Sequence, residues 1–201
     1  MTVHLPPLPP GPDEGYRPGG RSLVDIVDDE HRHLLELLDA ALAPDTPQPR
    51  RRELLDVFTA MLSRHLSGEE QYVFPATRVA VPDAAARIDR ELTCDAELLA
   101  AVRGLTEHSL PEVTDRLRRH VEAVDALVGS LRAHATDEEL IRLGNRMEIA
   151  EEAAPTRPHP GNPHTPPWNR IVDPAVGVLD KVRDVVSRRH TRLSDLRPPR
   201  D

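Results

Sequence analysis

Proline placement limits which parts of this chain can form long helices. Of the 21 prolines, 15 lie in residues 1–20, in residues 155–174 or at positions 198 and 199. The other six lie between or near the ends of apolar segments, where a helix tolerates proline. We therefore expect a disordered Pro/Gly-rich leader over residues 1–21, one helical domain over residues 22–154, and a Pro-rich strap with a C-terminal helix and tail over residues 155–201.

Apolar residues recur at helical spacing through the central domain. Short connections join the segments, so successive long helices should run antiparallel as an up-down-up-down four-helix bundle. A capping box, Thr136 followed by Glu139, marks the start of one further helix. The expected fold class is all-α, with extra C-terminal helices and the strap beside the bundle. The expected helices cover Ser22–Leu42, Arg50–Ala76, Asp83–Leu105, Pro111–His134, Thr136–Ala153 and Val176–Arg189.

The composition excludes several classes of partner. The net charge is −8 and no basic block is present, so we expect no nucleic-acid partner. No segment approaches the ~20 apolar residues that span a bilayer, and no signal-peptide pattern opens the chain, so we expect no membrane partner and no export. The single cysteine, Cys94, cannot form an internal disulfide or a cysteine cluster for zinc, which favours a cytoplasmic location.

Three histidines lie at the centres of apolar helical stripes. His31 has this position in the first expected helix, His65 in the second and His120 in the fourth. Glu69 follows His65 by four residues and therefore points the same way. One histidine on an apolar face is usually a core residue with its hydrogen bonds satisfied, but three in one bundle suggest a common site.

The third expected helix has carboxylates where the others have histidine. Asp95 lies at the centre of its stripe and Glu91 lies one turn earlier. Cys94 is expected to be a small packed residue at the side of the helix. A register shift of one residue would place Cys94 on the inner face in place of Asp95. Burying unpaired carboxylates is costly, and no arginine shares these stripes. Glu70 and Glu122 are expected to be exposed charges. Imidazole and carboxylate ligands together suit iron, with manganese or zinc possible, and the alternative is a polar network without metal.

These segments resemble the hemerythrin, or HHE cation-binding, family. The matching motifs are DDEHRHLLELL (Asp28–Leu38), RHLSGEEQYVFPA (Arg64–Ala76) and His120 followed five residues later by Asp125, and APTRPHPGNP (Ala154–Pro163) is similar to a tail of actinobacterial members. The resemblance covers residues 22–154. It implies a four-helix bundle with an oxo- or hydroxo-bridged di-iron centre that handles dioxygen, peroxide or nitric oxide. The metal ligands expected from the helical stripes and the resemblance together are His31, His65, Glu69, Glu91, Asp95, His120 and Asp125.

Two departures from the family pattern bear on this expectation. Asp95 aligns with a position that is usually histidine, which makes the ligand set harder and favours redox, detoxification or sensing over reversible oxygen carriage. Val124 stands where many bacterial members have glutamate. On an ideal helix Asp125 points about 140° away from His120. A π-bulge in this helix would turn Asp125 inward. Without a π-bulge, the site has one bridging carboxylate fewer and holds one metal ion or none. A bundle that binds no metal would be degenerate and would act as an interaction or structural module.

Overall fold

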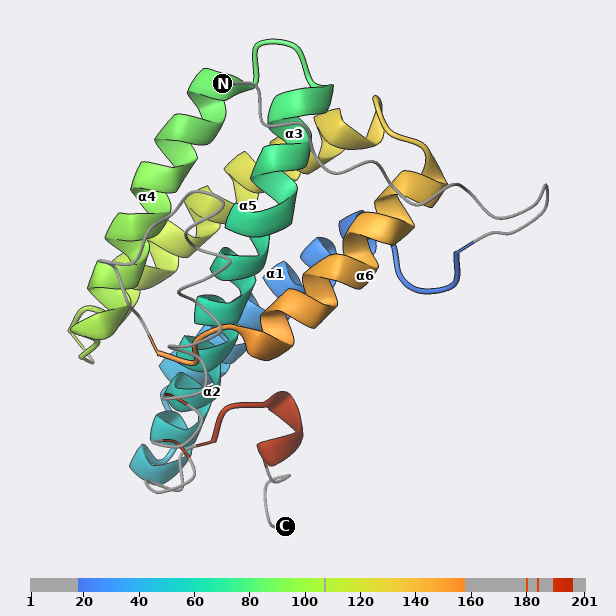
Figure 1. Ribbon diagram of the computed structural model, residues 1–201. Coiled ribbons are helices and arrows are strands. Elements are labelled where there is room, and N and C mark those ends of the chain that lie inside the picture. Colours follow the sequence, from blue (N-terminus) through green and yellow to red (C-terminus); the bar gives the residue numbers. More distant parts are fainter. Residues whose placement is uncertain (1–17, 107, 158–179, 181–183, 185–189, 197–201) are drawn as a thin grey trace.

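The computed structural model describes residues 18–106, 108–157, 180, 184 and 190–196, and the statements below concern these residues. Within them the regular structure is helical and no strand is present, which confirms the expected all-α class (Figure 1). The elements are α1 (Leu23–Leu42), α2 (Gln48–Gly68), the π-helical turn η1 (Glu69–Val73), α3 (Phe74–Ala80), α4 (Ala85–Arg103), α5 (Leu110–Arg132), α6 (Asp137–Ala153) and the 3-10 turn η2 (Leu193–Asp195).

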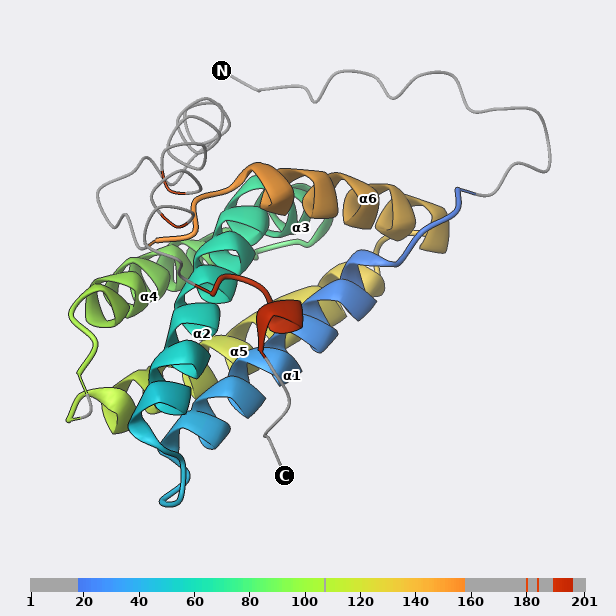
Figure 2. The same cartoon turned by 90° about the horizontal axis from the view of Figure 1, so that it is seen from below.

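Four long helical units form the bundle, because α2, η1 and α3 follow one another without a break. Helix α1 packs against α2 and α5, and α5 packs against α4. Helix α6 lies outside these four units and packs on both α1 and α2, as the two views show (Figures 1 and 2). No helix in the described part of the chain is both long enough and apolar enough to cross a membrane.

Three expected helix boundaries are wrong, two in the second unit and one in the third. The second unit starts earlier than expected, with Pro47 as the N-cap of α2, and it continues past Ala76 to Ala80. Pro75 interrupts nothing because it falls in the first turn of α3, directly after the π-helical turn. The third unit begins at Ala85 instead of Asp83, because Asp83 has a positive φ of 58° that an α-helix cannot include.

The start of α6 confirms the expected capping box. The Thr136 hydroxyl accepts from the Glu139 backbone N–H, and the Glu139 carboxylate accepts from the Thr136 backbone N–H at 2.8 Å. Two backbone donors that the first turn would otherwise leave free are thereby bonded.

We expect Thr136→Ala to lower the free energy of unfolding by about 1 kcal/mol, the usual cost of losing an N-cap side chain. Urea denaturation followed by circular dichroism measures the change. Thr93→Ala is the matched control, because the exposed Thr93 hydroxyl bonds only to the Asp89 carbonyl oxygen of its own helix. Equal stability of the two variants would contradict a capping role for Thr136.

The core consists of two apolar layers with a polar layer between them. One layer includes Leu34, Phe58, Leu98 and Leu117. The other layer lies on the opposite side of the polar residues, before them in α1 and α4 and after them in the second unit and α5. Buried histidines and carboxylates separate the two layers at the same height in all four units. The polar residues are therefore enclosed by aliphatic side chains on both sides. The second layer contains Leu23, Val27, Val73, Phe74, Ile88, Val124, Leu127 and Leu131 among others.

The described C-terminal residues contact the bundle and one another, and the Arg64 guanidinium on α2 donates to the Thr191 carbonyl oxygen at 2.6 Å. The Thr156 hydroxyl donates to the Asp184 carboxylate, and the Arg157 backbone N–H donates to the Asp180 carboxylate at 3.1 Å. Of the helix expected over Val176–Arg189, only Asp180 and Asp184 are described, and both are helical and buried. The rest of that helix and residues 158–167 of the strap lie outside the described residues.

Candidate metal centre

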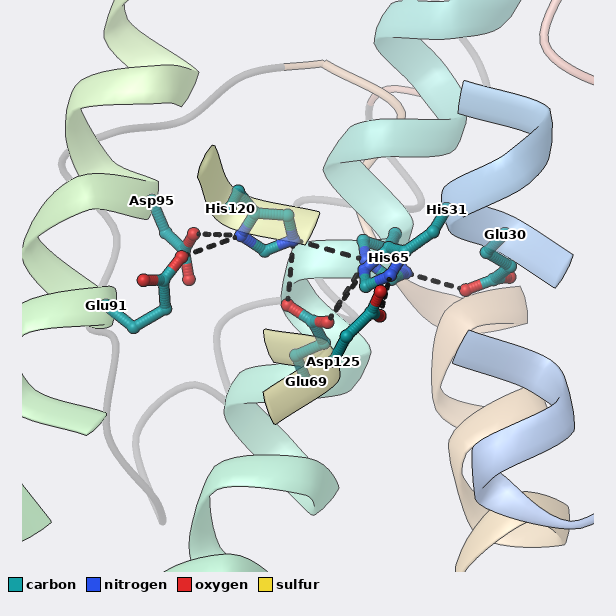
Figure 3. Close-up of polar contacts among 8 residues, drawn as sticks. All are labelled: Glu30, His31, His65, Glu69, Glu91, Asp95, His120 and Asp125. Carbon is teal, nitrogen blue, oxygen red and sulfur yellow. Dashed lines mark hydrogen bonds and ion pairs between the residues drawn. The ribbon is translucent and has the colours of Figure 1, made fainter. Parts of the chain in front are cut away.

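Four buried side chains from three helical units meet in the polar layer (Figure 3). His31 comes from α1, His65 from the last turn of α2, Glu69 from the first residue of η1 and His120 from α5. Each is at most 3% exposed. The three imidazole rings form a triangle, with centroids 4.8, 5.4 and 5.6 Å apart and planes crossed at 72–84°. The stripes of the sequence therefore converge as expected for these four residues.

The atoms that converge are the Nε2 nitrogens of the histidines and the two oxygens of Glu69. His65 Nε2 lies 3.1 Å and His31 Nε2 3.7 Å from Glu69 Oε1. His120 Nε2 lies 3.5 Å from Glu69 Oε2 and 3.5 Å from His65 Nε2. Ligand atoms around a tetrahedral ion with bonds of 2.0–2.1 Å are separated by about 3.3 Å. The spacing of these donors therefore matches that of ligands around one metal ion.

Three of these converging atoms are buried without a hydrogen bond. They are His31 Nε2 and both carboxylate oxygens of Glu69. Buried polar atoms almost always have a hydrogen-bond partner, because an unsatisfied one costs free energy. A cation at the centre of the four side chains would satisfy all three atoms at once.

Each imidazole also has a carboxylate at Nδ1, the nitrogen that faces away from the centre. An ionised carboxylate can accept a hydrogen bond but cannot donate one. The Nδ1 nitrogen therefore carries a proton, and Nε2 is the nitrogen left for a metal. Such carboxylate–histidine pairs are the usual second layer of metal sites. The pairs are His31 with Asp125 (2.8 Å), His65 with Glu30 (2.8 Å), and His120 with Asp95 (2.7 Å) and Glu91 (3.0 Å).

The structure thus brings together all seven side chains that the sequence singled out, in two different relations. His31, His65, His120 and Glu69 converge on one point. Glu91 and Asp95 form a second group around His120 Nδ1, and Asp95 Oδ2 is buried without a hydrogen bond. Asp125 lies behind the His31 ring with its side chain half-exposed.

Of the two alternatives for Asp125, a π-bulge or a regular helix, the structure has the regular helix. Helix α5 is regular from Leu110 to Arg132, so no bulge turns Asp125 toward the centre. The π-helical turn instead begins at Glu69, and its first three residues are all buried. The expectation that Glu70 is exposed is therefore wrong, whereas Glu122 is exposed as expected. The structure also fixes the register of α4, because Asp95 is buried while Cys94 is exposed. The expectation that Cys94 is a packed residue is therefore wrong.

Electrostatics hold the polar layer together as a network of ion pairs. Burial lowers the pKa of both His65 and His120, but the nearby Glu69 charge and the hydrogen bonds to Glu30 and Asp95 outweigh it. The net effect raises the pKa of His65 to about 10 and that of His120 well above its ordinary value. Burial raises the pKa of Glu69, yet the two imidazolium charges outweigh it and hold this pKa far below the usual range.

Two carboxylates of the site were not identified from the sequence. Glu30 precedes His31 by one residue. Residues share a helix face when they lie three or four positions apart, so the sequence provided no reason to place Glu30 beside His65. Glu151 lies on α6, and its carboxylate approaches that of Glu30. Its ligand atom, one of Glu30 and one of His65 lie within 4.8 Å of one another. The motif DDEHRH could have signalled Glu30, since a ligand histidine usually has a carboxylate at its other ring nitrogen and Glu30 is a carboxylate beside the site.

The sequence profile of the hemerythrin HHE cation-binding domain matches residues 22–145. The chain therefore belongs to this family of helical-bundle proteins. It is also 25% identical, over 142 residues, to an uncharacterized hemerythrin-like protein of Schizosaccharomyces pombe, and the match covers 65% of this chain and 70% of that protein. No solved structure matches the chain at a significant level.

Proposed function

We propose that this chain is an iron protein that reacts with dioxygen, peroxide or nitric oxide, and that it serves redox detoxification or sensing more than reversible oxygen carriage. The observation that carries the proposal is the convergence of three Nε2 atoms and the Glu69 carboxylate, with three of these atoms lacking a hydrogen bond. Three imidazoles and one carboxylate suit iron, and manganese or zinc would accept the same donors. Bound iron would supply open coordination positions and redox equivalents for a small diatomic gas or peroxide.

The residues of this chain divide into two roles under this proposal. His31, His65, His120 and Glu69 would hold the ion. Asp125, Glu30 and Asp95 would keep each histidine in the tautomer with Nδ1–H and fix the direction of its ring, which raises the basicity of Nε2. The Glu69 charge would offset part of the ion's charge in a layer that the apolar residues shield from water.

Carboxylates on α4 support redox or sensing roles over reversible carriage. Helix α4 contributes Glu91 and Asp95, and no histidine, to the polar layer. Carboxylates bonded to the Nδ1–H of His120 make its imidazole a more basic ligand, which favours the higher charge of the ferric state. A site biased toward ferric iron releases bound oxygen less readily as dioxygen.

A two-iron centre is the second candidate, and the free Asp95 Oδ2 favours it. In that arrangement Glu91 and Asp95 would leave His120 Nδ1 and become ligands of a second ion, as the family resemblance implies. The position of Asp125 supports the one-iron form, because its carboxylate is half-exposed and bonded to His31 Nδ1. A metal-free interaction module is the third candidate, since the ion pairs of His65 and His120 balance their charges without a metal.

Metal analysis separates these candidates. The protein is expressed with iron, purified without chelator, and its near-ultraviolet and visible spectrum is recorded. We expect about one iron per chain, held tightly enough that loading raises the thermal midpoint. Two irons per chain with oxo-bridged ferric bands would establish the two-iron centre. Only trace iron, with a thermal midpoint that added iron does not change, would contradict metal binding. Turnover of peroxide, dioxygen or nitric oxide by the loaded protein would then distinguish catalysis from sensing.

A further inference from the structure

A second set of side chains that can bind metal lies on the outer side of His65. One oxygen of Glu30, one nitrogen of His65 and one oxygen of Glu151 lie within 4.8 Å of one another. Glu30 Oε2 is 2.8 Å from His65 Nδ1, and Figure 3 shows Glu30 on the side of this ring that faces away from His120. The three side chains come from α1, α2 and α6, and we name them the outer cluster. It shares only His65 with the inner cluster, which is the convergent set His31, His65, Glu69 and His120.

The Glu151 carboxylate is the feature that points to a cation. Its Oε1 atom is buried and has no hydrogen-bond partner. A Cβ at Gly68 would lie 2.8 Å from this atom, so the carboxylate lies directly against the α2 backbone, where solvent does not reach Oε1. A buried polar atom without a partner is costly, and the neighbouring Glu30 carboxylate adds like-charge repulsion. A cation bound between the two carboxylates would remove both costs.

No arginine of the described residues forms an ion pair with the outer cluster. A cavity of about 450 Å³ is lined by Glu30 and Glu151, by the exposed Glu148 and by three arginines, among other residues. Each of these arginines is bonded to a group other than Glu30 or Glu151. The negative charge of the outer cluster therefore faces a cavity through which an ion can arrive. The three contacts are Arg64 with the Thr191 carbonyl oxygen (2.6 Å), Arg192 with Glu152 (3.2 Å) and Arg21 with Asp29.

The donors of the two clusters differ in chemistry. The inner cluster has three imidazoles and one carboxylate, whereas the outer cluster has two carboxylates and one imidazole. Carboxylate oxygens suit manganese(II) among the divalent transition ions, and ferrous iron accepts both kinds of donor. A neutral imidazole has a proton on one nitrogen and a free lone pair on the other. His65 therefore binds an outer ion through Nδ1 or an inner ion through Nε2, one at a time.

We propose that Glu30, Glu151 and His65 Nδ1 form a second metal site, which captures a divalent manganese or iron ion from the cavity before the ion passes to the inner cluster. An ion at Nδ1 replaces the proton there, and that proton leaves to solvent. When the inner cluster is filled, His65 Nε2 is in use, and two carboxylates alone hold an outer ion less tightly. The purified protein should therefore keep the inner ion. Only the passage to the inner cluster rests on the proposed function; capture of the ion does not.

Manganese(II) is the probe for this site, because the paramagnetic resonance signal of the free ion measures how much remains unbound. The metal-free full chain is titrated as the original protein and as three variants. Glu151→Gln keeps the size of the side chain and removes its charge, and Glu151→Asp keeps the charge and withdraws it by one methylene. Glu148→Gln is the matched control, because Glu148 lies about one turn earlier on α6, lines the same cavity and is exposed.

We expect Glu151→Gln and Glu151→Asp to weaken manganese binding at least about tenfold, because a lost ligand costs no less than a lost partner of a ligand. Glu148→Gln should bind manganese as the original protein does. Circular dichroism and the thermal midpoint check that each metal-free variant is folded, and Glu151→Asp tests the site if Glu151→Gln is not. The outer site is wrong if manganese affinity is equal in all four proteins. It is also wrong if Glu148→Gln loses as much affinity as Glu151→Gln, because the charge of the cavity alone would then attract the ion.

A second measurement follows ferrous iron as it enters the inner cluster. Rapid anaerobic mixing, stopped at set times with a ferrous chelator, measures bound iron against time. We expect Glu151→Gln to load about tenfold more slowly, the lower end of the rate gain that a charged cleft provides, and to reach the same final iron content. Glu148→Gln should load at close to the original rate. Equal loading rates for Glu151→Gln and the original protein would contradict passage of the ion through the outer site.

These results separate the outer site from the proposed function. If the original protein retains no iron, but manganese binding is lost in Glu151→Gln and kept in Glu148→Gln, the proposed function fails and the outer site stands. If the original protein retains iron and manganese binding does not depend on Glu151, the outer site alone is wrong.

Discussion

Replacing Glu69 with glutamine is expected to reduce metal affinity by more than about 100-fold, beyond the range for side chains that only orient ligands. Glu69 is the one charged donor among the four that converge, and its two oxygens face all three histidines. Glutamine keeps the size of the side chain but removes the charge and one acceptor. Titration of the purified metal-free protein with ferrous iron under anaerobic conditions measures the change.

The same variant should destabilise the metal-free protein, because Glu69 is the shared partner of two buried imidazolium groups. We expect the free energy of unfolding at pH 7 to fall by about 3 kcal/mol, the lower end for breaking a buried ion pair. The cost is limited because His65 and His120 can release protons once their pKa values fall. Glu122→Gln is the matched control, since it makes the same change at an exposed position of α5. Glu69→Gln protein with unchanged affinity would contradict a ligand role for Glu69.

Helical periodicity was sufficient to find the four convergent residues. His31, His65 and His120 each stand where the apolar stripe of a helix is deepest, and Glu69 shares the face of His65 because it lies four residues later. The result is independent of exact helix ends, so errors at Asp83 or Ala76 did not affect it. A short periodic pattern shows which face of a helix a side chain lies on. In a four-helix bundle the apolar face of each helix is turned toward the centre.

The partners of Nδ1 depend on geometry that periodicity does not contain. Glu30 is outside the deepest stripe of α1, but its long side chain reaches across to His65 on the neighbouring helix. Glu151 reaches the site because α6 packs on α1 and α2. Asp125 faces away from His120 along a regular α5, and it meets His31 because α1 and α5 lie side by side. These are pairwise relations between helices, and one helix's pattern cannot specify them.

The π-helical turn shows the same limit. The sequence indicated that a π-bulge, with one extra residue in a turn, would rotate Asp125 toward the centre of the bundle. It did not indicate which helix contains such a turn. The turn lies at Glu69–Val73, where it changes the phase of the helix just after the HxxxE pair. Glu70 is buried at this turn, on which α6 also packs.

The metal-free protein is expected to lose stability as the pH rises from 6.5 toward 10, and the metal-loaded protein is not. The pKa of His65 is raised from 6.5 to about 10 in the folded protein, so its contribution is fully present below pH 6.5 and is lost as the pH rises through 10. For a fully buried group a shift of this size is worth on the order of 5 kcal/mol. His120 acts in the same direction. Thermal or urea unfolding across this range, with and without iron, measures the difference.

Iron uptake should release protons for the same reason. In the metal-free site His65 and His120 each carry a proton on Nε2, and an ion can bind only when these protons leave. Calorimetric titration in buffers with different ionisation enthalpies should therefore count about two protons per ion near pH 7, and affinity should rise by up to about 100-fold per pH unit between pH 7 and 9. The two protons supply in the empty site the two positive charges that a divalent ion supplies in the loaded one, which explains why the polar layer can stay folded in both states. Affinity that is constant across this range, with no proton released, would show that both imidazoles are neutral before metal binds and would contradict the ion-pair description of the empty site.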